Sequence, residues 1–342
     1  MKTKSKSSHR AVCYSFGGAV CVGAILLTAT SAQAQILFEA DSGSGNIYEF
    51  AADGARSTFA SGVGQISGLA FNTAGNLFVA DPHTGSIYEF TPGGVKSTFA
   101  TGLFVLMLSC PMAFDNAGDL FMSDGVRIIE ITPGGAQGTF ASGGFDGLAF
   151  DSSGNLFASC PSSSNPSQSD KIFKFSPGGT QSTFLSGLTD PSGLAFDRAG
   201  DLFVANYTSG IINKITPGGV QSTFASGLPT PLSLTCDSAG NLLVATAGNG
   251  QGSAVIYKFT PGGARSTFAS GLYGPTALAF QPVPEPSLFG LLAVGATALL
   301  VRCRRPNLLR CYAASLSPQH QGVPVNLWPP RLPSPLASHR QS

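Results

Sequence analysis

Charged and histidine side chains are scarce in this sequence. Only 11% of its 342 residues are Asp, Glu, Lys or Arg, and there are 4 histidines. His83 is the only histidine inside the repeated region described below, where it falls in a variable loop. No Gly-x-Ser-x-Gly motif is present, so the sequence does not provide the serine–histidine–aspartate set of a hydrolase.

Metal-binding cysteine patterns and a positive central region are also missing. The chain has 7 cysteines but no Cys-x-x-Cys pair. Cys110, Cys160 and Cys236 fall among the repeats, where we expect small buried hydrophobic side chains, and whether any two of them pair is left open. Between residues 36 and 280, nine lysines and arginines face seventeen aspartates and glutamates, a net charge of −8. Nucleic-acid binding requires a positive surface, so we expect no nucleic-acid partner.

A repeated unit fills most of the chain. Its clearest marker is a Thr-Phe pair, with the phenylalanines at Phe59, Phe99, Phe140, Phe184, Phe224 and Phe268. Their spacings are 40, 41, 44, 40 and 44 residues. A period near 40 with several short strands per unit is typical of a β-propeller blade.

Each unit contains four candidate strands. In the second copy the first three span residues 68–71, 77–80 and 87–90, and the fourth carries Ser97-Thr98-Phe99. An Asp-x-x-Gly turn joins the first two, where glycine supplies the positive φ that ends the turn. A Thr-Pro-Gly-Gly turn joins the last two. Proline at its second position and glycine at its third predict a type II turn.

The two ends of the repeat array complement each other. The first copy lacks its first strand, and Ala277-Leu278-Ala279-Phe280 is a first strand without a blade of its own. We therefore predict an all-β, six-bladed propeller closed by the last strand, which removes free sheet edges. The alternative is a linear solenoid, which would need a cap at each end.

Both termini carry segments of a different character. Residues 1–34 have a basic start, an apolar run and Ala32-Gln33-Ala34, and they predict a cleaved signal peptide; a retained anchor is the alternative. The propeller spans 35–281. Residues 282–305 hold Pro284-Glu285-Pro286, an apolar run expected to form a short membrane helix, and Arg302, Arg304 and Arg305. The composition of 306–342 predicts a disordered tail.

Two resemblances follow from these motifs. The pattern GLAFDxxGNLFVAD…IYEFTPGG resembles the NHL-repeat and gluconolactonase/regucalcin-like six-bladed propellers over residues 36–280. The segment with Pro284, Glu285, Pro286 and the arginine cluster resembles a PEP-CTERM sorting signal. That resemblance implies export to a cell envelope or matrix rich in exopolysaccharide, with an exosortase as the processing partner. The 37 residues after Arg305 depart from the family pattern.

Two rings of residues are candidates for chemistry. The first precedes each first strand at the expected channel mouth: Ser67, Cys110, Asp146, Ser192, Leu232 and Thr276. The resemblance to calcium-dependent lactonases implies several acidic or amide ligands there. Calcium needs about six to eight oxygen ligands, and Asp146 is the only carboxylate of this ring. We therefore expect no cofactor, with Ca²⁺ as the alternative.

The second ring follows each second strand: Asp41, Asp81, Asp124, Cys160, Asn206 and Thr246. Its polar members either bind a cation or sugar hydroxyls, or cap their own loops by accepting backbone N–H bonds. A third set of charges lies on the third strands. Glu49, Glu89 and Glu130 occupy the first half of the ring, and Lys174, Lys214 and Lys258 the second half, where we expect solvated rim positions.

The sequence favours an exported, non-catalytic propeller that serves as a binding or structural module. Its partners would be polysaccharide or a surface protein, with membrane attachment through the C-terminal segment. Near-identical blades support this interpretation, because a catalytic ring normally carries blade-specific polar residues at its channel mouth. The alternative is a lactonase- or lyase-type enzyme that uses Asp146 with Asp81, Asp124 or Asn206.

Overall fold

A computed structural model describes residues 35–103, 110–162, 170–248 and 252–283 of the chain. The predicted signal peptide, with its cleavage residues Ala32 and Ala34, lies outside the described residues. The predicted sorting signal and the C-terminal tail also lie outside them. The part that is described contains no helix long and apolar enough to cross a membrane.

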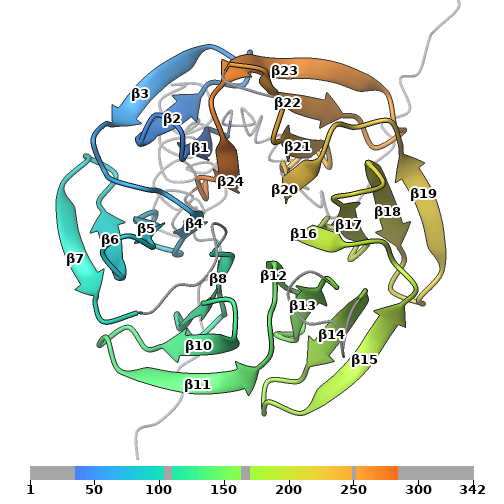
Figure 1. The fold of residues 1–342 in the computed structure, drawn as a ribbon, viewed down its shortest axis with the longest axis horizontal. Helices are drawn as coiled ribbons and strands as arrows, with labels where there is room; N and C mark the ends of the chain where they lie inside the picture. The colour runs from blue at the N-terminus through green and yellow to red at the C-terminus, as the bar shows by residue number, and fades with distance from the viewer. Residues whose placement is uncertain (1–34, 104–109, 163–169, 249–251, 284–342) are drawn as a thin grey trace, which may run out of the picture. The chain divides into compact units, whose positions relative to one another are not determined.

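Six four-stranded antiparallel sheets stand around a central axis as the blades of a propeller (Figure 1). Within blades 2 to 6 the chain runs from the innermost strand to the outermost. Blade 1 contains β24 (Pro275–Phe280), β1 (Leu37–Asp41), β2 (Asn46–Phe50) and β3 (Arg56–Ala60). Blade 2 contains β4 (Gly68–Phe71), β5 (Leu77–Asp81), β6 (Ser86–Phe90) and β7 (Lys96–Ala100). Blade 3 contains β8 (Met112–Phe114), β9 (Leu120–Ser123), β10 (Arg127–Ile131) and β11 (Gln137–Ser142).

Blades 4 to 6 repeat the same order. Blade 4 contains β12 (Gly147–Phe150), β13 (Leu156–Cys160), β14 (Lys171–Phe175) and β15 (Gln181–Ser186). Blade 5 contains β16 (Pro191–Phe196), β17 (Leu202–Asn206), β18 (Ile211–Ile215) and β19 (Gln221–Ala225). Blade 6 contains β20 (Pro231–Cys236), β21 (Leu242–Thr246), β22 (Ala254–Phe259) and β23 (Arg265–Leu272).

The last strand closes the ring, as predicted. β24 pairs antiparallel with β1, so that Leu37 lies opposite Phe280, Glu39 opposite Leu278 and Ala40 opposite Ala277. We call this β1–β24 pairing the closing seam. It confirms the closed six-bladed propeller and rules out the linear solenoid.

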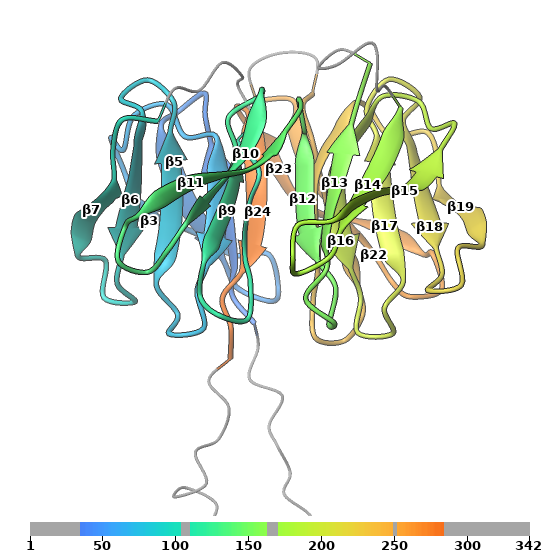
Figure 2. The same cartoon turned by 90° about the horizontal axis from the view of Figure 1, so that it is seen from below.

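The two faces of the ring differ (Figure 2). One, the turn face, carries the Asp-x-x-Gly turns, the Thr-Pro-Gly-Gly turns and the ends of the described propeller. The other, the loop face, carries the loops between the second and third strands of each blade and the connections that enter the next blade. Each innermost strand runs from the loop face toward the turn face, so the residues that precede it lie at the loop-face mouth of the channel.

The Asp-x-x-Gly turns form as predicted. In the fifth blade, the Asp197 carboxylate accepts bonds from the backbone N–H groups of Ala199 and Asp201, each at 2.9 Å. The N–H of Gly200 donates to the Asp197 carbonyl at 3.1 Å, and Gly200 has a φ of +83°. Glycine adopts this left-handed conformation without the penalty that a Cβ atom brings.

The Thr-Pro-Gly-Gly turns differ from the prediction. The N–H of Gly94 donates to the carbonyl of Thr91 at 2.8 Å, which closes a four-residue turn. Among the two glycines, only Gly94 has a positive φ, at +79°, so the type II assignment with a left-handed third residue is wrong. The conformation is a type I turn followed by a left-handed glycine, and this form fits the right-handed twist of paired strands.

Edge-to-face phenylalanine contacts fill the spaces between blades. In blades 1 to 4, the phenylalanine of the second strand contacts one from the outer strand of its own blade and one from the inner strand of the next. Phe157 lies 4.9 Å from Phe184 and 5.0 Å from Phe196 between ring centroids. The perpendicular arrangement places ring edges against ring faces, which adds to the hydrophobic stabilisation.

We predict that Phe157→Ala lowers the free energy of unfolding by about 3–5 kcal/mol, because it opens a cavity between blades 4 and 5. Urea denaturation followed by circular dichroism measures this loss. Val95→Ala is the control, because Val95 is 67% exposed and its truncation leaves no buried cavity. Equal effects of the two substitutions would contradict this account of the core.

Candidate functional site

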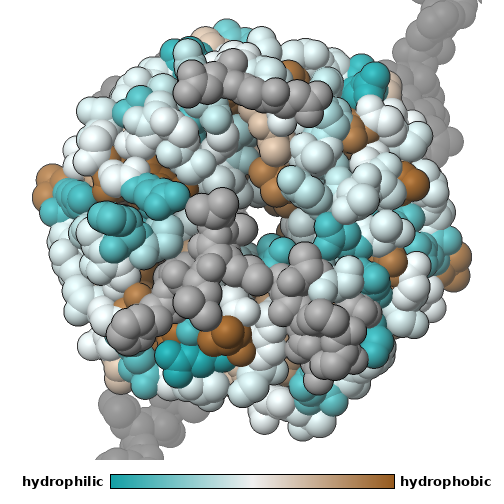
Figure 3. Space-filling model, in the orientation of Figure 1, coloured by the Kyte–Doolittle hydropathy of each residue, from teal (hydrophilic) through white to brown (hydrophobic). Residues whose placement is uncertain are grey.

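The channel mouth on the loop face is lined by the residues that open the innermost strands. An opening is visible at the centre of this face (Figure 3). The mouth cavity has a volume of about 80 Å³ and receives residues from all six blades. Its polar lining includes Ser67, Asp146, Ser233 and Thr276. Of the six residues predicted for this ring, Ser67, Asp146, Leu232 and Thr276 line the cavity, whereas Cys110 and Ser192 do not. The sequence analysis did not identify Ser233.

An apolar ring follows immediately inside the mouth. One side chain from each inner strand forms this apolar collar: Leu69, Met112, Leu148, Leu194, Leu234 and Leu278. All six are between 5% and 8% exposed. The collar presents no hydrogen-bonding side chain, so polar chemistry at this end of the channel is restricted to the mouth itself.

Glycines allow the inner strands to approach each other closely at the mouth. A Cβ atom at Gly68 would lie 2.0 Å from the carbonyl oxygen of Cys110, and one at Gly147 would lie 2.2 Å from the carbonyl oxygen of Ser192. Both distances are far shorter than van der Waals contact. Glycine at these positions therefore sets the small diameter of the channel, and any larger residue would force the blades apart.

The residues at the mouth do not fit a calcium site of the lactonase type. Asp146 is the only carboxylate in the lining, whereas Ca²⁺ needs about six to eight oxygen ligands with carboxylates among them. The hydroxyl groups of Ser192 and Thr276 donate to the carbonyl oxygens of Pro231 (3.0 Å) and Ile66 (3.2 Å). Across the described ranges, no group of three or more His, Cys, Asp or Glu side chains is placed to hold a metal ion.

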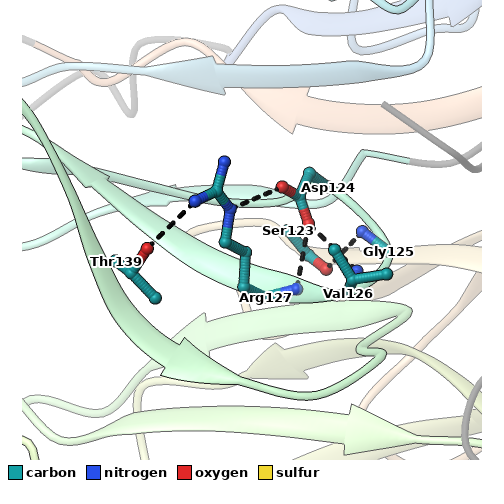
Figure 4. A network of polar contacts seen from close by, with 6 residues as sticks. All are labelled: Ser123, Asp124, Gly125, Val126, Arg127 and Thr139. Carbon is teal, nitrogen blue, oxygen red and sulfur yellow. Dashed lines mark hydrogen bonds and ion pairs between the residues drawn. The ribbon is translucent and has the colours of Figure 1, made fainter. Parts of the chain in front are cut away.

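Asp124 shows what the carboxylates at the ends of the second strands do (Figure 4). It is 1% exposed. One carboxylate oxygen accepts bonds from the backbone N–H groups of Val126 and Arg127, each at 2.9 Å. The other accepts the Nε–H of Arg127 at 2.9 Å, and Arg127 also donates to the Thr139 hydroxyl at 3.1 Å. The carboxylate is thus held within the loop of its own blade.

Asp41 and Asp81 act in the same way. Asp41 accepts the N–H of Ser44 at 2.9 Å and, with its second oxygen, the N–H of Tyr273 at 2.8 Å. The Tyr273 contact ties the connection that precedes β24 to the end of β1. Asp81 accepts the N–H of His83 at 3.0 Å. Both aspartates are buried.

Asn206 holds the same position in blade 5 and caps its loop with an amide. Its carbonyl oxygen accepts the N–H of Thr189 at 3.2 Å, and its Nδ2 donates to the side chain of Asn213 at 2.7 Å. Asp41, Asp81, Asp124 and Asn206 thus all bond to backbone groups of the loop-face segments. Of the five residues predicted to bind at the channel mouth, only Asp146 lines the mouth cavity. The other four, Asp41, Asp81, Asp124 and Asn206, do not.

The charges on the third strands contact the turn face of their own blades. The Lys214 ammonium lies 2.7 Å from the Asp201 carboxylate, and that of Lys258 lies 3.4 Å from Asp237. Glu89 instead accepts an amide bond from Asn76 at 2.7 Å. In blade 3, partial burial and then the neighbouring carboxylates of Asp119 and Asp115 raise the pKa of Glu130. The lysines thus face turn aspartates of opposite charge, whereas Glu130 lies near aspartates of its own sign.

Glu39 is a functional candidate that the sequence analysis did not identify. It lies in the middle of β1 and is completely buried, and neither of its carboxylate oxygens has a hydrogen-bond partner among the described residues. The signal was present in the repeat alignment, where Glu39 corresponds to Val79 of the second copy. A carboxylate at an apolar repeat position is the kind of exception that marks a special site.

Three cysteines fall within the described part of the chain, and all three are free. Burial is the main cause that raises the thiol pKa of Cys110 and Cys160 to about 11 and of Cys236 to about 12. Thiols with such pKa values are largely protonated at neutral pH and poor nucleophiles. The expectation of small buried hydrophobic residues fits Cys110 and Cys160, and Cys236 is half-buried.

No family model and no curated protein matches this chain. Solved structures do resemble it. A nidogen/laminin complex matches with 19% identity and a TM-score of 0.62, over 73% of this chain and 99% of that one. A protein described as a candidate gluconolactonase matches with 16% identity and a TM-score of 0.51, over 64% and 82%. A streptogramin B lyase matches with 14% identity and a TM-score of 0.50, over 68% and 87%. At these identities the similarity shows the fold alone.

We predict that Asp124→Ala lowers the free energy of unfolding by about 1–3 kcal/mol, because it leaves the loop N–H groups and the Arg127 guanidinium without their acceptor. Chemical denaturation measures this change. Asp53→Ala is the matched control, because Asp53 also accepts one backbone N–H but in an exposed turn. A stability loss no greater than that of the control would show that Asp124 is not a structural cap.

Proposed function

We propose that this protein is an exported, non-catalytic propeller that acts as a binding or structural module of the cell surface or its polysaccharide matrix. The observation that carries the proposal is the use of the repeated polar residues. Asp41, Asp81, Asp124 and Asn206 hold the loops of the rigid ring. The channel mouth is left with one carboxylate above an apolar collar, which is a poor basis for acid–base or metal-assisted catalysis.

The solved structures of similar fold include both kinds of function. One belongs to a nidogen/laminin complex, and the others are a candidate gluconolactonase and a streptogramin B lyase. The fold therefore does not decide between binding and catalysis, and the residues of this chain must. Their arrangement supports binding, and Asp146 keeps the lactonase or lyase alternative open to a direct test.

The proposed localisation rests on the two terminal segments. A signal peptide ending at Ala34 would export the chain. The PEP-CTERM-like segment, with Pro284, Glu285, Pro286 and the arginines at 302, 304 and 305, would bring it to an exosortase-type enzyme and the membrane. The matrix polysaccharide or a surface protein would then be the binding partner. The negative central domain makes nucleic acid an unsuitable one.

Affinity electrophoresis of the purified chain through gels containing matrix polysaccharide tests binding, and a lactone hydrolysis assay with and without Ca²⁺ tests the alternative. We expect concentration-dependent retardation by the polysaccharide and no lactone turnover. Asp146→Asn is the control variant, because it removes the only carboxylate of the mouth. Turnover by the natural chain that is lost in Asp146→Asn would overturn the proposal in favour of an enzyme. Unretarded migration would remove polysaccharide as the partner.

A further inference from the structure

Glu39 occupies the centre of the closing seam. On β1 it lies opposite Leu278 of β24 on one side and Tyr48 of β2 on the other. Its exposed fraction is 0%, and no hydrogen-bond partner for either carboxylate oxygen is found in the described structure. A buried polar group without a partner is costly, so a glutamate at this position requires an explanation.

The other five blades carry apolar residues at this position. The equivalent residues of β5, β9, β13, β17 and β21 are Val79, Met122, Ala158, Val204 and Val244. Each of these is completely buried, as Glu39 is. The repeat therefore needs only an apolar filler here, and the carboxyl is particular to the blade that closes the ring.

The side chain of Glu39 faces blade 6. Its neighbours on the same face of the sheet, Leu37, Tyr48 and Leu278, all pack in the hydrophobic cluster between blades 1 and 6. Blade 6 contributes Leu243, Ala245, Ala254, Ile256 and Leu272 to that cluster. The carboxyl is thus surrounded mainly by hydrocarbon, and an ionised oxygen there would lose nearly all of its hydration.

Few titratable groups are near enough to offset this loss. Asp41 on β1 disfavours a second negative charge, and Arg56 on β3 favours one. Arg56 is exposed and lies over the ring of Tyr48, on β2, at 4.8 Å. β24 and β21 carry no titratable side chain. On β22, the Lys258 ammonium pairs with Asp237 on the turn face, and the Tyr257 ring packs in the cluster between blades 5 and 6.

The connection between the strands is also particular to this blade. In the other five blades, a hairpin turn joins the two innermost strands; it is Asp-x-x-Gly in blades 3 to 6 and begins with Asn72 in blade 2. No such turn joins β24 to β1, because the two strands lie at opposite ends of the described propeller sequence. Strand pairing and the nearby non-covalent contacts, such as that of Asp41 with the Tyr273 N–H, hold them together. The closing seam can therefore separate without straining a hairpin.

We propose that Glu39 makes the closing seam a pH-sensitive joint: the protonated carboxyl keeps β1 and β24 paired, and loss of its proton releases β24 from β1. The step is an acid dissociation, with the proton passing to solvent as the seam opens. Proteins open locally in this way, with free energies that range from near zero up to that of global unfolding.

The direction of the pH dependence follows from the titration of Glu39. Burial, and then the charge of Asp41, raise the pKa of Glu39 well above its usual range in the closed ring, and Arg56 only partly opposes them. In the open state the pKa returns to about 4.3. The closed state therefore binds more protons. Its stability is highest below the open-state pKa and falls as the pH rises toward the closed-state pKa.

Hydrogen exchange of the full chain, followed by mass spectrometry of peptides covering β1 and β24, tests the proposal. Rates are measured from about pH 5 to about pH 9 and corrected for base-catalysed exchange of unstructured peptides. We expect protection of the β1 and β24 peptides to fall as the pH rises, by up to about tenfold for each pH unit between the open-state and closed-state pKa values of Glu39. Peptides covering β16 and β17 in blade 5 should keep their protection.

Two variants separate the carboxyl from the strand pairing itself. Glu39→Gln keeps the shape of the side chain without its proton, and Glu39→Val installs the residue of blades 2, 5 and 6. We expect the selective pH dependence to vanish in both. The proposal is overturned if β1 and β24 keep constant corrected protection across this range in the natural chain. It is also overturned if all blades lose protection together, or if both variants retain the selective loss.

Discussion

Pairing between the first and last strands is the constraint on which the rest of the ring depends. Each blade has two apolar faces, and each face is buried only by its neighbour. Without the β1–β24 ladder, blade 1 would lose its innermost strand, and the faces between blades 6 and 1 would open to water. The edge-to-face phenylalanine contacts that blades 1 to 4 each make with the next blade, such as Phe157 with Phe196, extend the same principle around the ring. Closure leaves every blade covered by a neighbour on both faces, whereas an open end would expose an apolar face and a strand edge.

The small diameter of the channel and the capped loops together limit what the ring can do. Gly68 and Gly147 let inner strands approach until little more than a mouth and an apolar collar remains. Asp124 and its equivalents bind backbone N–H groups and so stay out of that mouth. The result is a stiff scaffold whose variable parts are surface loops. Such a scaffold suits recognition, because binding residues are commonly held on loops over a rigid frame.

Much of the fold could be predicted from the sequence, because the six repeats can be aligned with each other and equivalent strands identified. The extra strand at Ala277–Phe280 and the missing one before Leu37 predicted closure, which the ladder confirms. Asp146 was placed correctly at the mouth, since its position before an inner strand fixes its height along the axis. The positions of Asp41 and Asp81 in the sequence could not show whether their carboxylates bind a ligand or cap a loop, because both roles use the same residue types. The predicted type of the Thr91–Gly94 turn was wrong, because two adjacent glycines permit a positive φ at either position. Glu39 was overlooked although its repeat equivalents are apolar.

Removal of β24 tests the central claim most directly. A chain that ends after Gly274 keeps blades 2 to 6 complete and lacks β24, the innermost strand of blade 1, together with all residues after it. Equilibrium unfolding followed by circular dichroism and by size-exclusion chromatography compares it with the full chain. The account predicts loss of the single cooperative transition, with partial unfolding or association through the free edge of β1. A monomer that unfolds in one transition at the same denaturant concentration as the full chain would contradict it.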